Sequence, residues 1–418
     1  MRSGDDPVVI ELDAAPASLN HVTSGDYCER CVASALHHPV LELTARTGNR
    51  DHFEFKVVRG KSFSDGSAVR AEDVLRTLVT ASASPMWSRY LRYLSKVEAV
   101  ADTLFVTTRQ PADFLPAMLE AVDFAPTHPD GRWGNGPYRM SHDFSAGRGY
   151  YLLTPNPHFP DAGQRPELVF AVRPDVEATP ERFLRGEADI TCGTAFPLKR
   201  LAEWRGNDAL RSAPTGIYMQ LEPNQAGPGT VEPCAWKTLR DCLDLHGIAE
   251  KFSGGLHPVA PNRRPAKAPS GTLPSCIKIS YHDFYPNLLV LQDLAYQWRD
   301  RLGIDTEFVV RDYADFSRDE VDACFALRYS AFKHPFAFYA QCTALTQDPV
   351  LDRLLQSLAA CEPGSLEALR DRLDQTVPIL RLFEVIGHWL SGPRVTGFSW
   401  PTDAAFDFTQ LRADRCRA

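Results

Sequence analysis

Two cysteines one helical turn apart, Cys28 and Cys31, form a CxxC motif, and His37 and His38 follow shortly after it. Thiols and imidazoles can hold zinc, but such a site needs a fourth ligand in register, and no second CxxC exists in the sequence. A redox role needs a thioredoxin-like context, which is absent here. The spacing therefore favours two small residues near a helix start, one of them facing inward, and we expect no metal site. The scatter of all ten cysteines is typical of reduced, mostly buried thiols.

Two segments place aromatic side chains beside polar ones. One runs from Arg328 to Phe336, just after a predicted strand, and the other runs from Trp133 to Tyr138. Ligand sites in α/β proteins often lie at strand ends, with apolar walls and a few polar groups. The same residue types also pack in cores, with Lys333 in solvent, so the residues alone leave both interpretations open.

No local signature of catalysis is present, since the HExxH, GxSxG, Walker and Rossmann GxGxxG patterns are all missing. The stretch 134–136, Gly-Asn-Gly, precedes Pro137, which has no N–H to offer to a phosphate, so a tight turn is the simpler interpretation. Catalysis by residues that the fold brings together remains open. By position alone, the candidate acids and bases are Glu222, His334 and Asp26.

Short strands that alternate with helices must position these residues, and this alternation predicts an α/β fold. Apolar and polar side chains alternate in the manner of strands at 53–58, 104–108, 151–153, 168–172, 217–221, 277–281, 306–310 and 323–327. Amphipathic spacing and capping residues predict helices at 71–82, 179–184, 235–250, 286–302, 349–360 and 365–382. Segments 222–232 and 254–275 are rich in proline and glycine, and the first of them is a candidate domain crossing.

The composition is that of a globular protein, with 418 residues, 44% of them hydrophobic and 23% charged. This length allows two to four domains. The net charge of −8 gives no general attraction to nucleic acid, and no apolar run is long enough to insert in a membrane. The N-terminus leads straight into Val8 without the apolar region of an export signal. We therefore expect a cytoplasmic protein, or an extracytoplasmic one if a leader has been removed.

The most specific stretch is 53–74, FEFKVVRGKSFSDGSAVRAEDV. It resembles the signature of family 5 solute-binding proteins, the peptide- and nickel-type receptors of ABC importers. The pattern has a physical sense, because Asp65 and Gly66 suit a turn, and Glu72 and Asp73 suit the first turn of a helix. Further landmarks of the family follow in order at 11–20, 134–138, 183–190, 244–248 and 301–304.

This resemblance implies two α/β lobes of the periplasmic-binding-protein type, class II, which are joined by two crossings and close on a ligand by hinge motion. The first lobe would comprise 1–223 and 394–418, with an inserted subdomain at about 40–165, and the second lobe would comprise 224–393. The expected ligand-binding residues are Asn20, Tyr27, Trp133, Glu222, Arg328, Tyr329, Phe332, Lys333 and His334.

One departure from the family concerns the anchor for a peptide's amino group. The family often has an Asp-Tyr-x-x-Pro element, whose aspartate pairs with that amine in peptide receptors. Aligning on Pro335 puts Ala331 at the aspartate and Phe332 at the tyrosine. Arg328, Lys333 and His334 would instead favour an anionic or carboxylate-bearing ligand.

We therefore expect a monomeric solute-binding protein that closes two lobes around a small molecule, either peptide-like or otherwise polar or anionic. No cofactor is expected. An ABC permease would be its partner if the protein is exported. The alternative is a cytoplasmic member of the fold, repurposed as a biosynthetic enzyme or a ligand sensor, and we do not favour catalysis.

Overall fold

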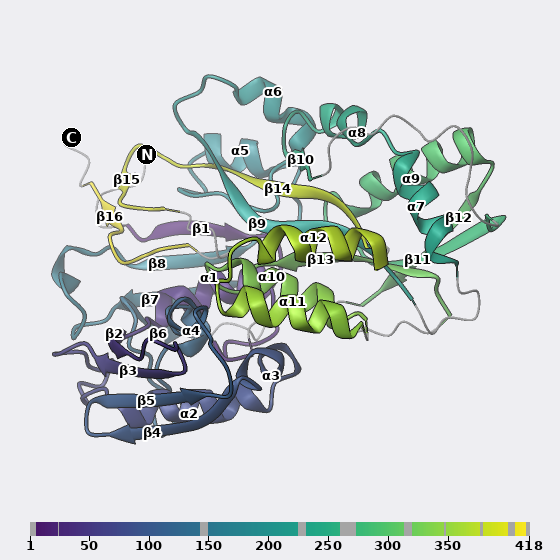
Figure 1. Ribbon diagram of the computed structural model, residues 1–418. Coiled ribbons are helices and arrows are strands. Elements are labelled where there is room, and N and C mark those ends of the chain that lie inside the picture. The colour runs from purple at the N-terminus through teal and green to yellow at the C-terminus, as the bar shows by residue number, and fades with distance from the viewer. Residues whose placement is uncertain are drawn as a thin grey trace.

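The computed structural model shows a two-lobe α/β protein in which helices cover the outer faces of three main sheets (Figure 1). One four-stranded sheet belongs to the first lobe, a second four-stranded sheet forms a subdomain, and a six-stranded sheet extends into the second lobe. The structure describes residues 6–23, 25–142, 149–224, 231–259, 273–312, 320–346, 348–376, 379–399 and 406–414.

The first-lobe sheet has the strand order β1-β8-β7-β6. Its strands are β1 (Val8–Leu12), β6 (Tyr138–His142), β7 (Tyr150–Pro155) and β8 (Leu168–Val172). All five residues of β1 are buried, as an unbroken apolar strand requires, and β1 pairs in parallel with β8. Helix α1 (Tyr27–Leu36) packs against this sheet. It begins at Asp26, which forms a capping box with Glu29.

The subdomain sheet is antiparallel, with the order β2-β3-β5-β4. Its strands are β2 (Leu41–Arg46), β3 (His52–Val57), β4 (Leu94–Val100) and β5 (Thr103–Thr108). Phe53, Phe55 and Val57 alternate with more exposed neighbours and point into the core, as a period of two dictates. The helices of the subdomain are α2 (Ala71–Ser82), α3 (Pro85–Leu91), α4 (Leu115–Leu119) and the short η1 (Val122–Phe124).

Two long strands, β9 (Leu210–Pro223) and β14 (Leu380–Leu390), run side by side through the middle of the molecule (Figure 1). They pair antiparallel from Leu210 with Leu390 to Leu221 with Leu380. Both belong to the six-stranded sheet β10-β14-β9-β13-β11-β12. Its other strands are β10 (Leu256–Pro258), β11 (Cys276–His282), β12 (Asp305–Arg311) and β13 (Ala323–Tyr329). The lobe boundaries at 223/224 and 393/394 stay a prediction.

All the strands predicted from the sequence are present, but two helix predictions need correction. The segment 235–250 forms two helices, α7 (Pro233–Asp241) and α8 (Leu245–Lys251), because the side chain of Asp244 caps a new helix start by accepting a hydrogen bond from the Gly247 amide. The segment 365–382 is helical only in α12 (Ser365–Thr376), since Leu380 already belongs to β14.

The longer helices of the second lobe are α9 (Asn287–Leu302), α10 (Pro335–Thr343) and α11 (Pro349–Ala359). The short elements are α5 (Thr179–Leu184), α6 (Leu201–Trp204), η2 (Ala162–Gln164), η3 (Leu198–Arg200), β15 (Val395–Thr396) and β16 (Arg412–Ala413). Helices α2, α5, α9 and α11 match predicted helices, whereas α1, α10 and strand β14 were not predicted from the periodic pattern.

Gly134 and Gly136 are required by close backbone packing, which the sequence did not reveal. A Cβ on Gly134 would lie 2.0 Å from the carbonyl oxygen of Leu36, and one on Gly136 would lie 2.5 Å from the amide nitrogen of His37. The Gly136 amide also donates to the Leu36 carbonyl, at 2.8 Å. The two glycines therefore let the chain press against the end of α1, which no other residue could do.

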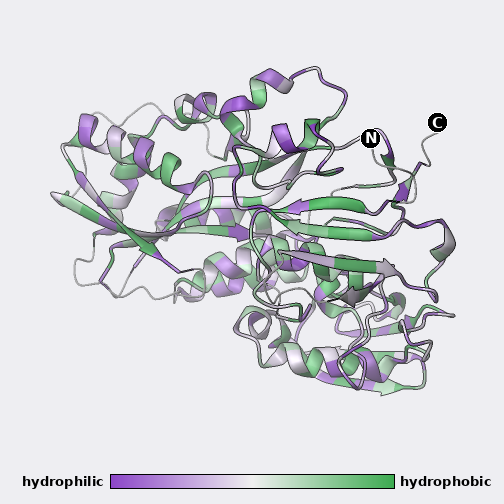
Figure 2. Ribbon diagram, turned by 180° about the vertical axis from the view of Figure 1, so that it is seen from behind, coloured by the Kyte–Doolittle hydropathy of each residue, from purple (hydrophilic) through white to green (hydrophobic). Residues whose placement is uncertain are grey.

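Hydrophobic residues follow the strands at the centre of the molecule, whereas the surrounding helices carry both hydrophobic and hydrophilic residues (Figure 2). This is the distribution expected for helices that bury one face. Among the described residues, no helix has both the length and the apolar character needed to cross a membrane.

Candidate functional site

The subdomain meets the second lobe along a surface that we call the seam, formed by α3, η1 and α4 on one side and by β13, α10 and α11 on the other. Aromatic rings fill part of it. Phe114 stacks on Phe336 with 4.1 Å between ring centroids, and Tyr90 meets Phe332 edge to face at 5.3 Å. One continuous hydrophobic cluster therefore spans both sides, and Phe332, which is 1% exposed, belongs to it.

Glu222 and Arg328 form an ion pair beside the seam. Arg328 donates from Nε and Nη2 to the two carboxylate oxygens of Glu222, at 2.6 and 2.8 Å. The Glu222 side chain is completely buried, and it also accepts a hydrogen bond of 2.8 Å from Gln220. A buried carboxylate held by two parallel hydrogen bonds is a strong, directional partner for a guanidinium. An anionic ligand would have to compete with Glu222 for Arg328.

A second ion pair joins the first lobe to the subdomain. Arg30 of α1 donates to both carboxylate oxygens of Asp123 in η1, at 2.8 and 2.6 Å, and both side chains are fully buried. The Arg30 guanidinium also lies 5.1 Å from the centre of the Tyr329 ring on β13. The Tyr329 hydroxyl in turn contacts the Met86 sulfur, at 3.6 Å. First lobe, subdomain and second lobe thus converge around Arg30.

A cavity of about 380 Å³ opens at the seam between α3 and the helices α10 and α11. Two guanidinium groups, one carboxylate and two hydroxyls are available in its wall. The lining residues are Arg89, Arg92, Ala340, Thr343, Ala344, Thr346, Pro349 and Asp352. Within the part of the chain that the structure describes, Arg89 makes no ion pair with a carboxylate. Guanidinium groups with nearby hydroxyls suit a carboxylate, and a lone carboxylate suits an ammonium group.

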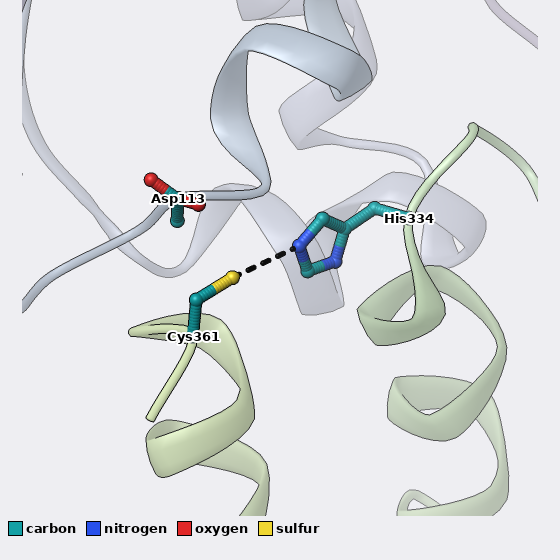
Figure 3. A group of neighbouring side chains, drawn as sticks. All are labelled: Asp113, His334 and Cys361. Carbon is teal, nitrogen blue, oxygen red and sulfur yellow. Dashed lines mark hydrogen bonds between the residues drawn. The ribbon is translucent and has the colours of Figure 1, made fainter. Parts of the chain in front are cut away.

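His334 caps helix α10 and lies beside Cys361 and Asp113 (Figure 3). Its Nδ1 accepts a hydrogen bond from the Phe336 amide at 3.1 Å, and its Nε2 lies 3.5 Å from the Cys361 sulfur. Burial lowers the pKa of His334, while Asp113 opposes that shift. His334 is therefore neutral near pH 7 and offers no positive charge to an anion.

The other residues predicted to bind ligand lie apart from this cavity. Lys333 and Asn20 are exposed, and Trp133 is 37% exposed. Tyr27 is half-buried at the start of α1, where its hydroxyl accepts a hydrogen bond of 3.3 Å from the Gly193 amide. Their role in ligand binding stays a prediction.

The CxxC pair lies in the first-lobe core. Cys28 and Cys31 are 3% and 0% exposed, so the expectation that only one would face inward is wrong. Both are free thiols, and Cys28 donates to the Asp13 carboxylate at 3.1 Å. Burial raises the pKa of both thiols, which makes them poor nucleophiles. Asp26, a candidate acid, caps α1, and burial raises its pKa to about 7.

Sequence reasoning missed the charged residues of the cavity. Arg89 and Arg92 lie three positions apart, a spacing that places two side chains on one face of a helix. This spacing could have suggested an anion site, but two arginines three positions apart are also common on the solvent-exposed face of a helix. Asp352 lies on α11, far along the chain, and only the fold places it at the same cavity.

Two sequence comparisons bear on the identity of the chain. Residues 46–245 match the family model described as bacterial extracellular solute-binding proteins, family 5 Middle. None of the curated proteins matches the sequence significantly.

Solved structures match over almost the whole chain. The murein tripeptide binding protein MppA of Escherichia coli is 16% identical, with 98% of each chain covered and a TM-score of 0.83. Haemophilus influenzae OppA in complex with the peptide RPPGFSPFR is 17% identical, with 99% of this chain and 100% of that chain covered and a TM-score of 0.83. NikA from Staphylococcus aureus in complex with Ni(L-His)2 is 14% identical, with 98% and 100% covered and a TM-score of 0.80.

The unliganded open form of MppA superposes less well. Its TM-score is 0.68, at 17% identity and with 98% and 97% of the two chains covered. Whole-chain superposition is sensitive to the relative placement of two lobes, so the lobes of this chain are arranged less like that open form. Residues 46–245 are thus similar to the family 5 solute-binding proteins, and nearly the whole chain shares the two-lobe fold of MppA, OppA and NikA.

Proposed function

We propose that this protein is a solute receptor that closes its two lobes around a small polar molecule bearing a carboxylate, such as a short peptide. The observation that carries the proposal is the pair of superpositions. The chain fits peptide-bound OppA with a TM-score of 0.83 and the unliganded open form of MppA with 0.68. A closed arrangement of two lobes is what sequesters a ligand in a hinged receptor.

The cavity at the seam supports this ligand class. Arg89 and Arg92 would receive a carboxylate, and Thr343 and Thr346 would add hydrogen bonds. Asp352, also in the wall, would pair with an ammonium group. Positive and negative groups in one cavity of about 380 Å³ match a small zwitterion in both charge and size.

The same cavity offers a substitute for the missing amine anchor. Ala331 stands where the family's peptide receptors carry an aspartate, and it is completely buried in the aromatic cluster of the seam. An amine therefore has no carboxylate at that position. Asp352 supplies one on α11 instead.

We further propose that the protein, if exported, delivers its ligand to an ABC permease and acts as a monomer outside the cytoplasm. The support is the family match, because receptors of this type work with such permeases. Detection of a removed export signal would support this location, and a mature N-terminus at Met1 in a cytoplasmic fraction would contradict it.

A thermal-shift screen tests the receptor function. The panel would hold short peptides, the same peptides with an amidated C-terminus, and free amino acids. A ligand at 100 times its Kd stabilises the fold by about 2.7 kcal/mol, and amidation should remove most of that effect. The absence of any stabilising compound, or the conversion of a binder into product, would overturn the proposal.

A further inference from the structure

We infer that Asp113, His334 and Cys361 form a binding site for a divalent ion of borderline softness, with Zn²⁺ as the best fit, that ties the subdomain to the second lobe. Their donor atoms all lie within 4.8 Å of one another (Figure 3). A thiolate, an imidazole and a carboxylate are the three ligand types that Zn²⁺ takes in proteins. This inference does not depend on the proposed solute or on its cavity.

The distance between two of the donors fits one ion. Tetrahedral Zn²⁺ with bonds of about 2.3 Å to sulfur and about 2.1 Å to nitrogen requires those donors to be about 3.6 Å apart. Cys361 Sγ and His334 Nε2 are 3.5 Å apart. Asp113 also hydrogen bonds to Cys361, so the third donor already faces the thiol. Three protein ligands leave one position open for water or a further group.

The backbone holds these donors in place. The Asp113 amide donates to the Ala359 carbonyl at 2.8 Å, across the seam and two residues before Cys361. Arg50 donates to the Ala360 carbonyl at 2.9 Å, and Arg46 donates to the Asp113 carboxylate at 2.8 Å. Hydrogen bonds of this kind, made by residues around the ligands, orient a ligating carboxylate before an ion binds.

Cys361 occupies an unusual position for a cysteine. It follows the end of α11 with φ +52°, in the left-handed region that favours glycine. Its amide donates to the Leu358 carbonyl, and the Glu362 amide donates to the Ser357 carbonyl, both at 3.0 Å, as in a Schellman motif. The backbone at this position is strained for any residue with a side chain, and glycine would relieve that strain. The residue found here is nevertheless the cysteine that supplies the thiol of the cluster.

Ion binding requires two proton movements. The Cys361 thiol, which donates a hydrogen bond to the Asp113 carboxylate, must lose its proton to solvent when it binds the ion. The groups that face it are Asp113, His334, Arg46 and Arg50. For Nε2 to bind the ion, the proton of the neutral His334 ring must move from Nε2 to Nδ1, and Nδ1 then no longer accepts the hydrogen bond from the Phe336 amide.

Titration of the chelator-treated full-length protein with Co²⁺ and Zn²⁺ tests the site. Co²⁺ should bind one to one and give a thiolate-to-cobalt charge-transfer band, and Zn²⁺ should abolish that band and raise the Tm. Cys361→Gly suits the left-handed backbone, so it should fold at least as well as the wild type while losing the band and the Zn²⁺ effect. His334→Asn keeps a helix cap and removes the imidazole, so it should weaken binding at least tenfold.

Cys276→Ser is the matched control, because Cys276 is another exposed, free cysteine and lies on β11. It should retain both the band and the Zn²⁺ effect. A wild type that binds neither ion, or a Cys361→Gly variant with an unchanged band, would overturn the assignment.

Discussion

Arg328 binds Glu222 through two hydrogen bonds, of 2.6 and 2.8 Å, between neighbouring antiparallel strands of the six-stranded sheet. Both residues are predicted from the sequence to bind ligand, and in the structure each is the partner of the other. The positive charge of Arg328 is therefore matched by a buried carboxylate. In the described part of the chain, two guanidinium groups that form no ion pair with a carboxylate lie instead at the cavity, on and next to α3.

Removing one member of this pair should be costly. In Arg328→Met the Glu222 carboxylate stays buried without its ion partner, and we expect a loss of about 3–5 kcal/mol in the free energy of unfolding, measured with urea. Replacing both residues, in Glu222→Gln with Arg328→Met, should recover much of that loss. A double variant as unstable as the sum of the two single variants would contradict this account.

The close approach at Gly136 gives a second prediction. A methyl group there would meet the backbone of His37 and Leu36, which cannot move without shifting the end of α1. Gly136→Ala should therefore lower the free energy of unfolding by about 3 kcal/mol. Gly163→Ala is the control, since nothing lies within 4 Å of a Cβ there, and it should change stability by less than about 0.5 kcal/mol. Equal effects of the two substitutions would contradict the packing argument.

His21 should make stability depend on pH. Its ring stacks on His37 at 3.9 Å, and burial lowers its pKa to about 4, although its hydrogen bond to the Ala125 carbonyl opposes that shift. The folded protein therefore binds fewer protons than the unfolded chain between pH 6.5 and about 4. Stability should fall across this range as the pH is lowered, by about 3 kcal/mol from this residue.

Unfolding of the wild type and of His21→Gln at several pH values measures this contribution. Glutamine keeps a donor for the Ala125 carbonyl but does not titrate. The difference in stability between the two proteins should shrink as the pH falls from 6.5 to 4. A constant difference would show that His21 does not titrate as described.

The sequence predicted eight of the sixteen strands of the described chain, because the pattern of those eight is local. Phe53, Phe55 and Val57 alternate with polar residues, and the structure buries all three. The break between α7 and α8 was also local in origin, since Asp244 is a good helix cap, but the apolar spacing on both sides continued without interruption. Because the apolar periodicity was given more weight than the capping residue Asp244, the prediction joined α7 and α8 into one helix.

The site was harder to predict because its contacts are distant in the sequence. Glu222 and Arg328 are 106 positions apart, and no local pattern tells a paired arginine from a free one. The need for Gly136 comes from the backbone of α1, about a hundred residues earlier in the chain. The resemblance to a family predicted the two-lobe fold. It did not predict the cavity, because the residues that line the cavity are not among the motifs that carry the resemblance.

The most direct test of the account is calorimetric titration of the tightest ligand from the screen into the wild type and into Arg89→Met. Methionine keeps most of the side-chain volume and removes the guanidinium, and Arg70→Met, with Arg70 exposed at the N-cap of α2, serves as the control. We predict one site in the wild type and in Arg70→Met, and at least tenfold weaker binding in Arg89→Met, since a charged hydrogen bond contributes about 1.5–3 kcal/mol. Equal affinities in all three proteins would show that the solute does not bind in the cavity between α3 and α10–α11.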